Sequence, residues 1–225
     1  MKRITLLSCL LLFSMEVFSQ SLVNNEVGGW LMFFNRTRFH EKWSLHTEIQ
    51  DRFYDVSAKE EQLLIRGGLN YHLNQKTWLT AGYGYIESYP PDDVVADKIV
   101  EHRIWQQVMH FHSIGRVAFE HRGRLEQRFV GDRYRDRVRY RLMATIPFNN
   151  RLMQPKTFFG AIYNEIFLHQ FESSPYDRNR FYTALGYQFT TGTNLQAGYM
   201  AQNFSGKTKG YLQLGLTSNL YLLGK

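Results

Sequence analysis

The chain has 225 residues, with 27 basic and 20 acidic side chains and a formal net charge of +7 at pH 7. Its only cysteine, Cys9, lies near the start, so the rest of the chain can form neither a disulfide framework nor a cysteine nucleophile. Aromatic residues make up 16% of the chain, and no later apolar run is long enough for a membrane-spanning helix.

The first segment has the order of an export signal. Lys2 and Arg3 precede an apolar run from Ile4 to Phe13, and Ser19 supplies a small residue before a cleavage point. The run is shorter than the roughly 20 residues that a spanning helix needs. We therefore expect residues 1–19 to be a signal peptide that is removed, and residues 20–225 to form a single domain.

Polar and apolar residues then alternate along the chain. The pattern begins in "WSLHTEIQDRF" from Trp43 and is clearest in "RDRVRYRLMATI" from Arg135, where arginine occupies every second position from 135 to 141. A helix would divide these arginines between two sides, whereas a strand places them on one face and the apolar residues on the other. The alternation therefore predicts strands.

Eleven segments share this pattern, most of them longer than the five or six residues usual for strands of soluble proteins. Alternating segments of about ten residues between turns are typical of transmembrane barrels. The segments are 26–38, 43–54, 62–73, 77–89, 98–112, 117–130, 135–147, 157–171, 179–190, 194–204 and 210–222. The sequence thus predicts an all-β, antiparallel up-and-down transmembrane barrel. Because such barrels usually have an even strand number, we expect ten or twelve strands.

The connections between these segments fall into two classes. Tight polar turns at 40–42, 74–76, 113–115 and 191–193 alternate with longer connections at 55–61, 90–97 and 172–178. Short periplasmic turns and longer outer loops are the rule in outer-membrane barrels, and only the segment 148–156 departs from it. We see no linker or internal repeat, so one domain is expected.

The polar face is expected to line the interior, because an arginine on the lipid face would cost about 2–4 kcal/mol at mid-depth. Two neighbouring segments, 117–130 and 135–147, carry most of the charge, and we expect a ladder of opposite charges between them with cations left over. The predicted interior network is Glu48, Arg66, Glu101, Arg103, Glu120, Arg122, Arg124, Glu126, Arg128, Arg137, Arg139, Arg141 and Glu165. It either plugs the barrel or lines a narrow anion-favouring passage.

Four stretches carry a resemblance to a known family. They are "EHRIWQQV" (101–108), "YNEIFL" (163–168), "NRFYTALGYQF" (179–189) and "WSLHTEIQDRF" (43–53). They resemble the Gram-negative outer-membrane family catalogued as domain of unknown function 2490, over nearly the whole chain after the signal. The resemblance implies a β-barrel at the outer membrane and brings no activity, cofactor or catalytic residue. Many barrels end in an aromatic residue, but here Tyr221 lies four residues from the end.

Other functions find less support in the sequence. Glu165 and His169 share a strand face but lie roughly 13 Å apart along it. Neither G-x-S-x-G nor H-E-x-x-H occurs, and His102, His110 and His112 do not make a converging metal set. Nucleic-acid binding is opposed by the export signal and by the acids interleaved with the arginines. We expect no metal, no cofactor and no nucleic-acid partner.

The sequence therefore favours a non-enzymatic, structural envelope protein or a narrow, porin-like channel that favours anions. The alternative is a lipid- or envelope-modifying barrel enzyme with its active site at the rim. The expected partners are outer-membrane lipid, lipopolysaccharide and the barrel-assembly machinery, and the expected location is the outer membrane of a Gram-negative bacterium.

Overall fold

The structure is a computed structural model that describes residues 27–55, 59–91, 94–171 and 174–222. The expected signal peptide, residues 1–19, lies outside the described residues. Within them the chain forms strands, turns and loops, and it has no helix that is long and apolar enough to cross a membrane.

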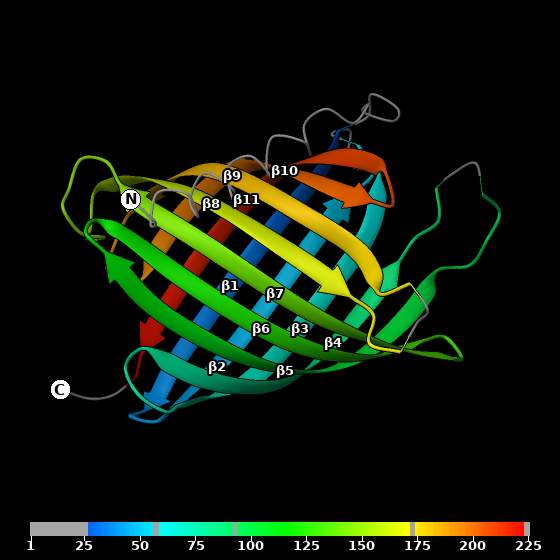
Figure 1. Ribbon diagram of the computed structural model, residues 1–225, viewed down its shortest axis with the longest axis horizontal. Coiled ribbons are helices and arrows are strands. Elements are labelled where there is room, and N and C mark those ends of the chain that lie inside the picture. Colours follow the sequence, from blue (N-terminus) through cyan, green and yellow to red (C-terminus); the bar gives the residue numbers. More distant parts are fainter. Residues whose placement is uncertain (1–26, 56–58, 92–93, 172–173, 223–225) are drawn as a thin grey trace, which may run out of the picture.

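In the described part of the chain, eleven strands close into one barrel, which confirms the predicted all-β barrel class. Each lies within a few residues of the segment predicted for it (Figure 1). The strands are β1 (Gly28–His40), β2 (Trp43–Phe53), β3 (Glu60–His72), β4 (Thr77–Ser88), β5 (Ile99–Ile114), β6 (Val117–Val130), β7 (Arg133–Pro147), β8 (Thr157–Leu168), β9 (Tyr176–Gln188), β10 (Thr193–Phe204) and β11 (Lys207–Tyr221).

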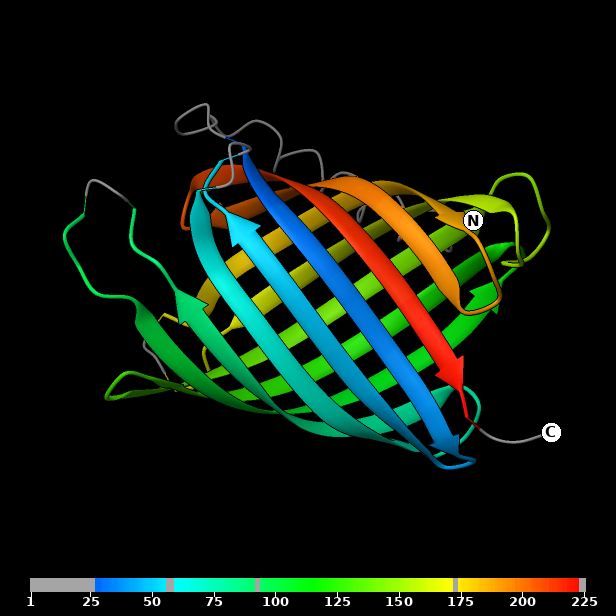
Figure 2. The same cartoon turned by 180° about the vertical axis from the view of Figure 1, so that it is seen from behind.

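The barrel closes through a parallel pair, and this accounts for its odd strand number. Consecutive strands pair antiparallel throughout, so the first and the eleventh strand run in the same direction. They pair from Gly28 opposite Tyr211 to Arg38 opposite Tyr221, and Figure 2 shows them side by side. Eleven lies within the expected range of about ten to twelve strands, whereas the expected even number was wrong because it assumed an antiparallel closure.

The two ends of the barrel differ in their connections. One end, here called the short-turn rim, joins β1–β2, β3–β4, β5–β6, β7–β8 and β9–β10, and the other is called the long-loop rim (left and right in Figure 1). The long-loop rim also contains two tight turns, β6–β7 and β10–β11, in which Gly131 and Gly206 adopt positive φ. The expected alternation of short and long connections is thus only partly present.

Strand alternation gives the barrel two different surfaces. The outer surface carries large apolar side chains, among them Leu31, Ile65, Leu125 and Leu214, each between 44% and 51% exposed. The inner surface is largely polar over β2–β7, with Leu64, Ile86 and Trp105 buried among the polar groups. It is apolar over part of β1 and β8–β11, where a buried cluster comprises Trp30, Phe159, Tyr182, Met200 and Tyr211.

Trp105 fills the interior beside β3 and β4 because two glycines leave room for it. Its side chain is fully buried, and a Cβ added at Gly68 would lie 2.7 Å from the indole. At Gly82 an added Cβ would lie 2.5 Å from the indole and 2.3 Å from the carbonyl oxygen of Gly67. These glycines are therefore required by close packing against the ring.

Gly82→Ala should lower the free energy of unfolding by about 1–3 kcal/mol, because the new methyl group overpacks the interior against Trp105 and a backbone oxygen. Urea unfolding of the refolded protein in detergent micelles measures this change. Gly67→Ala is the matched control, since its Cβ would meet only the carbonyl oxygen of His46 at 3.7 Å. Equal unfolding midpoints for the two variants would contradict this packing argument.

Candidate functional site in the barrel interior

The thirteen residues predicted for the interior network lie together in the structure. Ten are at least nine-tenths buried, and the other three, Glu120, Arg128 and Arg141, are half-buried. Each of the thirteen has a residue of opposite charge from the same set within 4.0 Å. Alternation along each strand is what turns all of them to the inner surface.

Glu126 on β6 is the centre of this network. Its carboxylate lies 2.6 Å from Nη2 of Arg137 and 2.7 Å from Nη1 of Arg139, and its side chain is fully buried. Arg103 and Arg124 approach it at 3.6 and 3.7 Å. One carboxylate therefore neutralises guanidinium groups from β5, β6 and β7, which is the arrangement that makes buried arginines tolerable.

Glu165 on β8 is a second centre, joined to the first by Arg139. Its carboxylate lies 2.7 Å from Nη2 of Arg122 and 2.8 Å from Nη2 of Arg139. Toward the ends of the strands, Glu101 binds Arg103 at 2.6 Å and Arg128 at 2.7 Å, and Glu120 binds Arg141. The charges form a continuous band along β5–β8.

The expected ladder between β6 and β7 is only partly present. Glu126 does lie opposite Arg137, but Arg122 lies opposite Arg141 and Arg124 opposite Arg139. Like charges in direct opposition repel, so their acids must come from a diagonal position or from another strand. Arg139 accordingly reaches Glu165 on β8, and Arg122 on β6 reaches across β7 to the same carboxylate.

A separate network occupies the β2–β3 wall. Glu48 accepts hydrogen bonds from Nε and Nη2 of Arg66, both at 2.6 Å, and lies 3.0 Å from Nε2 of His46. Gln50 donates to the same carboxylate. This paired-fork geometry is the strongest form of ion pair between arginine and a carboxylate.

Sequence reasoning missed several charged residues of the interior. Arg52 belongs to the polar stripe of β2 but was not assigned to the network. Asp177 and Arg178 were expected in a loop, yet β9 begins at Tyr176, so both lie in the strand. Arg180 shares its strand face with Tyr182, and that alternation is the signal that could have identified it.

The interior contains a cavity of about 210 Å³ next to this network. Ten arginines line it, together with two glutamates, Glu61 and Glu165. Residues of the apolar cluster, including Trp30 and Tyr182, complete its wall. The cavity is therefore strongly cationic, with aromatic side chains in part of its wall.

One serine–histidine pair also lies inside the barrel. Oγ of Ser44 is 2.8 Å from Nε2 of His72 and accepts a hydrogen bond from Asn70 at 2.9 Å. Ser44 is fully buried, so a substrate cannot reach its hydroxyl. Glu165 and His169 do not form a pair, because His169 lies beyond the end of β8, where its Nδ1 is 3.2 Å from the carbonyl oxygen of Asp136.

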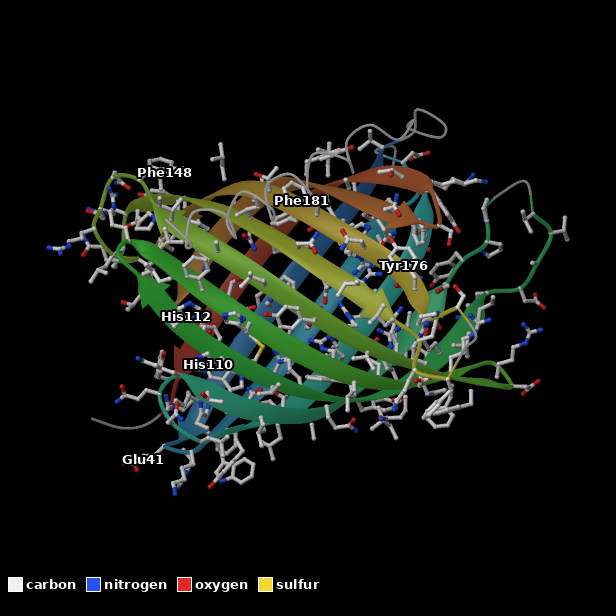
Figure 3. All side chains as sticks on the ribbon, viewed as in Figure 1. Glu41, His110, His112, Phe148, Tyr176 and Phe181 are labelled. Carbon is white, nitrogen blue, oxygen red and sulfur yellow. The ribbon has the colours of Figure 1, made fainter. Side chains whose placement is uncertain are left out.

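His110 and His112 of β5 and His121 of β6 face outward near the short-turn rim, where Figure 3 labels the first two. The three rings stack at ring-centroid distances of 5.1–6.2 Å. His102 is separate and bonds the hydroxyl of Tyr83 at 2.5 Å. In the described ranges, no three His, Cys, Asp or Glu side chains converge as a metal site.

At the long-loop rim, Glu87 gathers three donors. Tyr85 and Tyr89 each donate a hydrogen bond to its carboxylate at 2.7 Å, and Lys98 donates at 2.6 Å. The hydrogen bond to Glu87 raises the pKa of Tyr89 to about 12. These contacts tie the β4–β5 loop to the end of β4.

Comparison with known proteins confirms the family expected from the sequence. The model of the family described as "Protein of unknown function (DUF2490)" matches residues 27–213. The match includes all thirteen residues of the predicted network. No curated protein matches the chain.

Glu126→Gln should lower the free energy of unfolding by about 3–5 kcal/mol, because it leaves Arg137 and Arg139 without their shared buried counter-charge. Urea unfolding in micelles provides the measurement. Glu41→Gln is the control for the chemical change, since Glu41 is exposed in the β1–β2 turn. A Glu126 variant as stable as the control would show that the network does not depend on this carboxylate.

Proposed function

Since the chain belongs to the DUF2490 family, whose description assigns no activity, we propose a function from the structure: a non-enzymatic, structural outer-membrane barrel with a closed interior. Its partners under this proposal are outer-membrane lipid, lipopolysaccharide and the barrel-assembly machinery. The interior network serves to fill and stiffen the barrel.

The outer surface supports the membrane location. Large apolar side chains cover it, and monomeric soluble proteins rarely expose contiguous apolar areas of this kind. The strands have 11 to 16 residues, long enough for tilted strands to cross a hydrocarbon layer that needs about 9–11. The charges are placed on the inner surface, where lipid does not meet them.

Burial of the inner side chains is the observation that carries the closed-barrel proposal. Glu126, Trp105, Phe167 and Met200 come from four different strands, and each has at most 1% of its surface exposed. In a water-filled pore, side chains of the inner wall would be exposed to solvent. Here they contact one another instead, so the interior resembles a packed core.

The sequence analysis left two alternatives to a structural barrel. The excess of arginine around the cavity favours a narrow anion-selective channel as the runner-up. An envelope-modifying enzyme has less support, because among the described residues no acidic side chain contacts the Ser44–His72 pair, and Ser44 is fully buried.

The refolded protein should insert into a planar bilayer without conducting ions, because its interior is filled. Single-channel recording tests this, with a porin reconstituted in the same way as positive control. The variant Arg137→Gln/Arg139→Gln/Arg141→Gln is recorded beside it. A steady anion-selective current that weakens in selectivity in this variant would replace the closed barrel with the channel alternative.

Leu214→Arg should reduce folding into lipid vesicles, because it places a cation at the middle of the outward face of β11, at a cost of about 2–4 kcal/mol in hydrocarbon. Ile114→Arg, at the short-turn end of β5, should fold nearly as well as the unchanged protein. The folded fraction is read from the gel mobility of unheated samples in SDS. Equal folding of both variants would argue against a membrane-embedded outer surface.

A further inference from the structure

The lining residues of the interior cavity differ in how deeply they are buried along the barrel. Its lining residues Arg52, Gln62, Arg178 and Phe204 lie near the long-loop ends of their strands and are half-buried. Deeper lining residues, such as Arg180, Tyr182 and Gln213, are buried. Lining residues on the short-turn side, such as Met143 and Gln196, are half-buried as well, so the cavity is most deeply buried in the middle of the barrel.

Two cations in this cavity make no direct ion pair. Within the described residues, neither Arg52 nor Arg180 has a carboxylate within 4.0 Å, although Glu165 lies opposite Arg180 in the β8–β9 register. Arg52 donates instead to the amide oxygens of Gln50 and Gln62, both at 2.6 Å, and Arg180 donates through Nε to Gln202 at 2.6 Å. Neutral amides satisfy hydrogen bonds but do not cancel charge, so neither cation is neutralised by a direct contact.

Trp30 lies against both of these arginines. The guanidinium carbon of Arg52 is 4.0 Å from the centroid of its ring, and that of Arg180 is 4.9 Å away. The ring is 5% exposed. Contact with an aromatic face stabilises a cation in part, yet it also holds the two guanidinium groups in fixed places beside the cavity.

The same cavity contains polar atoms that lack partners. The indole Nε1 of Trp30 and the hydroxyl of Tyr182 are buried and make no hydrogen bond within the described structure. The same is true of Nε of Arg122 and of Arg141. All four residues line the cavity. A buried donor without an acceptor costs free energy, so a ligand that supplies acceptors would be stabilised there.

We propose that this cavity binds a phosphate-type oxyanion, which Arg52 and Arg180 neutralise and to which the unpartnered cavity donors can turn. An oxyanion offers several acceptor oxygens that match the forked geometry of guanidinium, whereas chloride offers one diffuse charge. The proposal rests on the closed barrel, since an open pore would hydrate these groups. It adds a ligand class to an otherwise structural interior.

Isothermal titration calorimetry of the refolded full-length chain tests this, in a non-ionic detergent and a phosphate-free buffer. Sodium phosphate, sodium sulfate and sodium chloride are the probes. Phosphate and sulfate should bind with millimolar or better affinity, and chloride at least about tenfold more weakly. Arg52→Gln and Arg180→Gln should each weaken phosphate binding about tenfold or more, the usual effect of losing a hydrogen bond to a charged group.

Arg135→Gln is the matched control, because Arg135 lies on the exposed end of β7 and outside the cavity lining. Should an arginine variant fail to fold, two further measurements still decide. These are the preference for phosphate over chloride, and a phosphate-dependent change in tryptophan fluorescence that disappears in Trp30→Phe. Absence of oxyanion binding, equal binding of chloride, or cavity variants that bind as well as the control would each overturn the proposal.

A further arm compares inorganic phosphate with glycerol 3-phosphate, a soluble phosphate monoester. Tighter binding of the monoester assigns the site to a phosphorylated headgroup, and tighter binding of inorganic phosphate assigns it to the free ion. Conductance measurements distinguish a failure of the binding proposal from a failure of the closed-barrel proposal. A conducting protein that binds phosphate overturns only the closed barrel, and a silent one that binds no oxyanion overturns only the binding site.

Discussion

The arrangement of the interior depends on one constraint, which is that a buried guanidinium group needs a carboxylate close by. Glu126 meets it for arginines from three strands, and Glu165 extends the pairing through Arg139. Removal of charge from water costs several kcal/mol per ion, so these contacts offset a large penalty more than they add stability. The positions of Arg52 and Arg180 are notable for this reason, because the rest of the network satisfies a rule that these two residues do not.

The filled interior follows from barrel size as well as from charge. Eleven strands enclose more space than the eight that side chains fill readily, and less than the sixteen that leave an open channel. Long arginines span the gap over β5–β8, and Trp105 does so beside β3 and β4. Over β8–β11 small residues such as Ala161 and Ala184 leave room for the rings of Phe159 and Tyr182. Large and small side chains thus complement each other around the wall and leave a cavity in the interior.

Strand alternation was enough to predict the barrel and the direction of its charged side chains. The period of two places Arg137, Arg139 and Arg141 on one face whatever strand lies beside them. Strand register could not be predicted from alternation. The sequence of β7 does not say that Arg139 lies opposite Arg124 of β6 and forms an ion pair with Glu165 of β8. The contact of Trp30 with Arg180 could not be predicted either, because the two residues are 150 positions apart and are brought together only when β1 closes on β11. The even strand number was mispredicted, because the rule that barrels have an even number of strands assumes that the closing pair is antiparallel.

The parallel closing pair has a consequence for the two ends of the folded chain. Gly28 begins β1 at the long-loop rim, and Tyr221 ends β11 at the short-turn rim. A polypeptide that crosses a bilayer an odd number of times starts in one compartment and finishes in the other. In a membrane, the start of this barrel would therefore face the opposite side from its end. Assembly would have to translocate one chain end in addition to inserting paired hairpins, a step that a barrel with an even number of strands does not require.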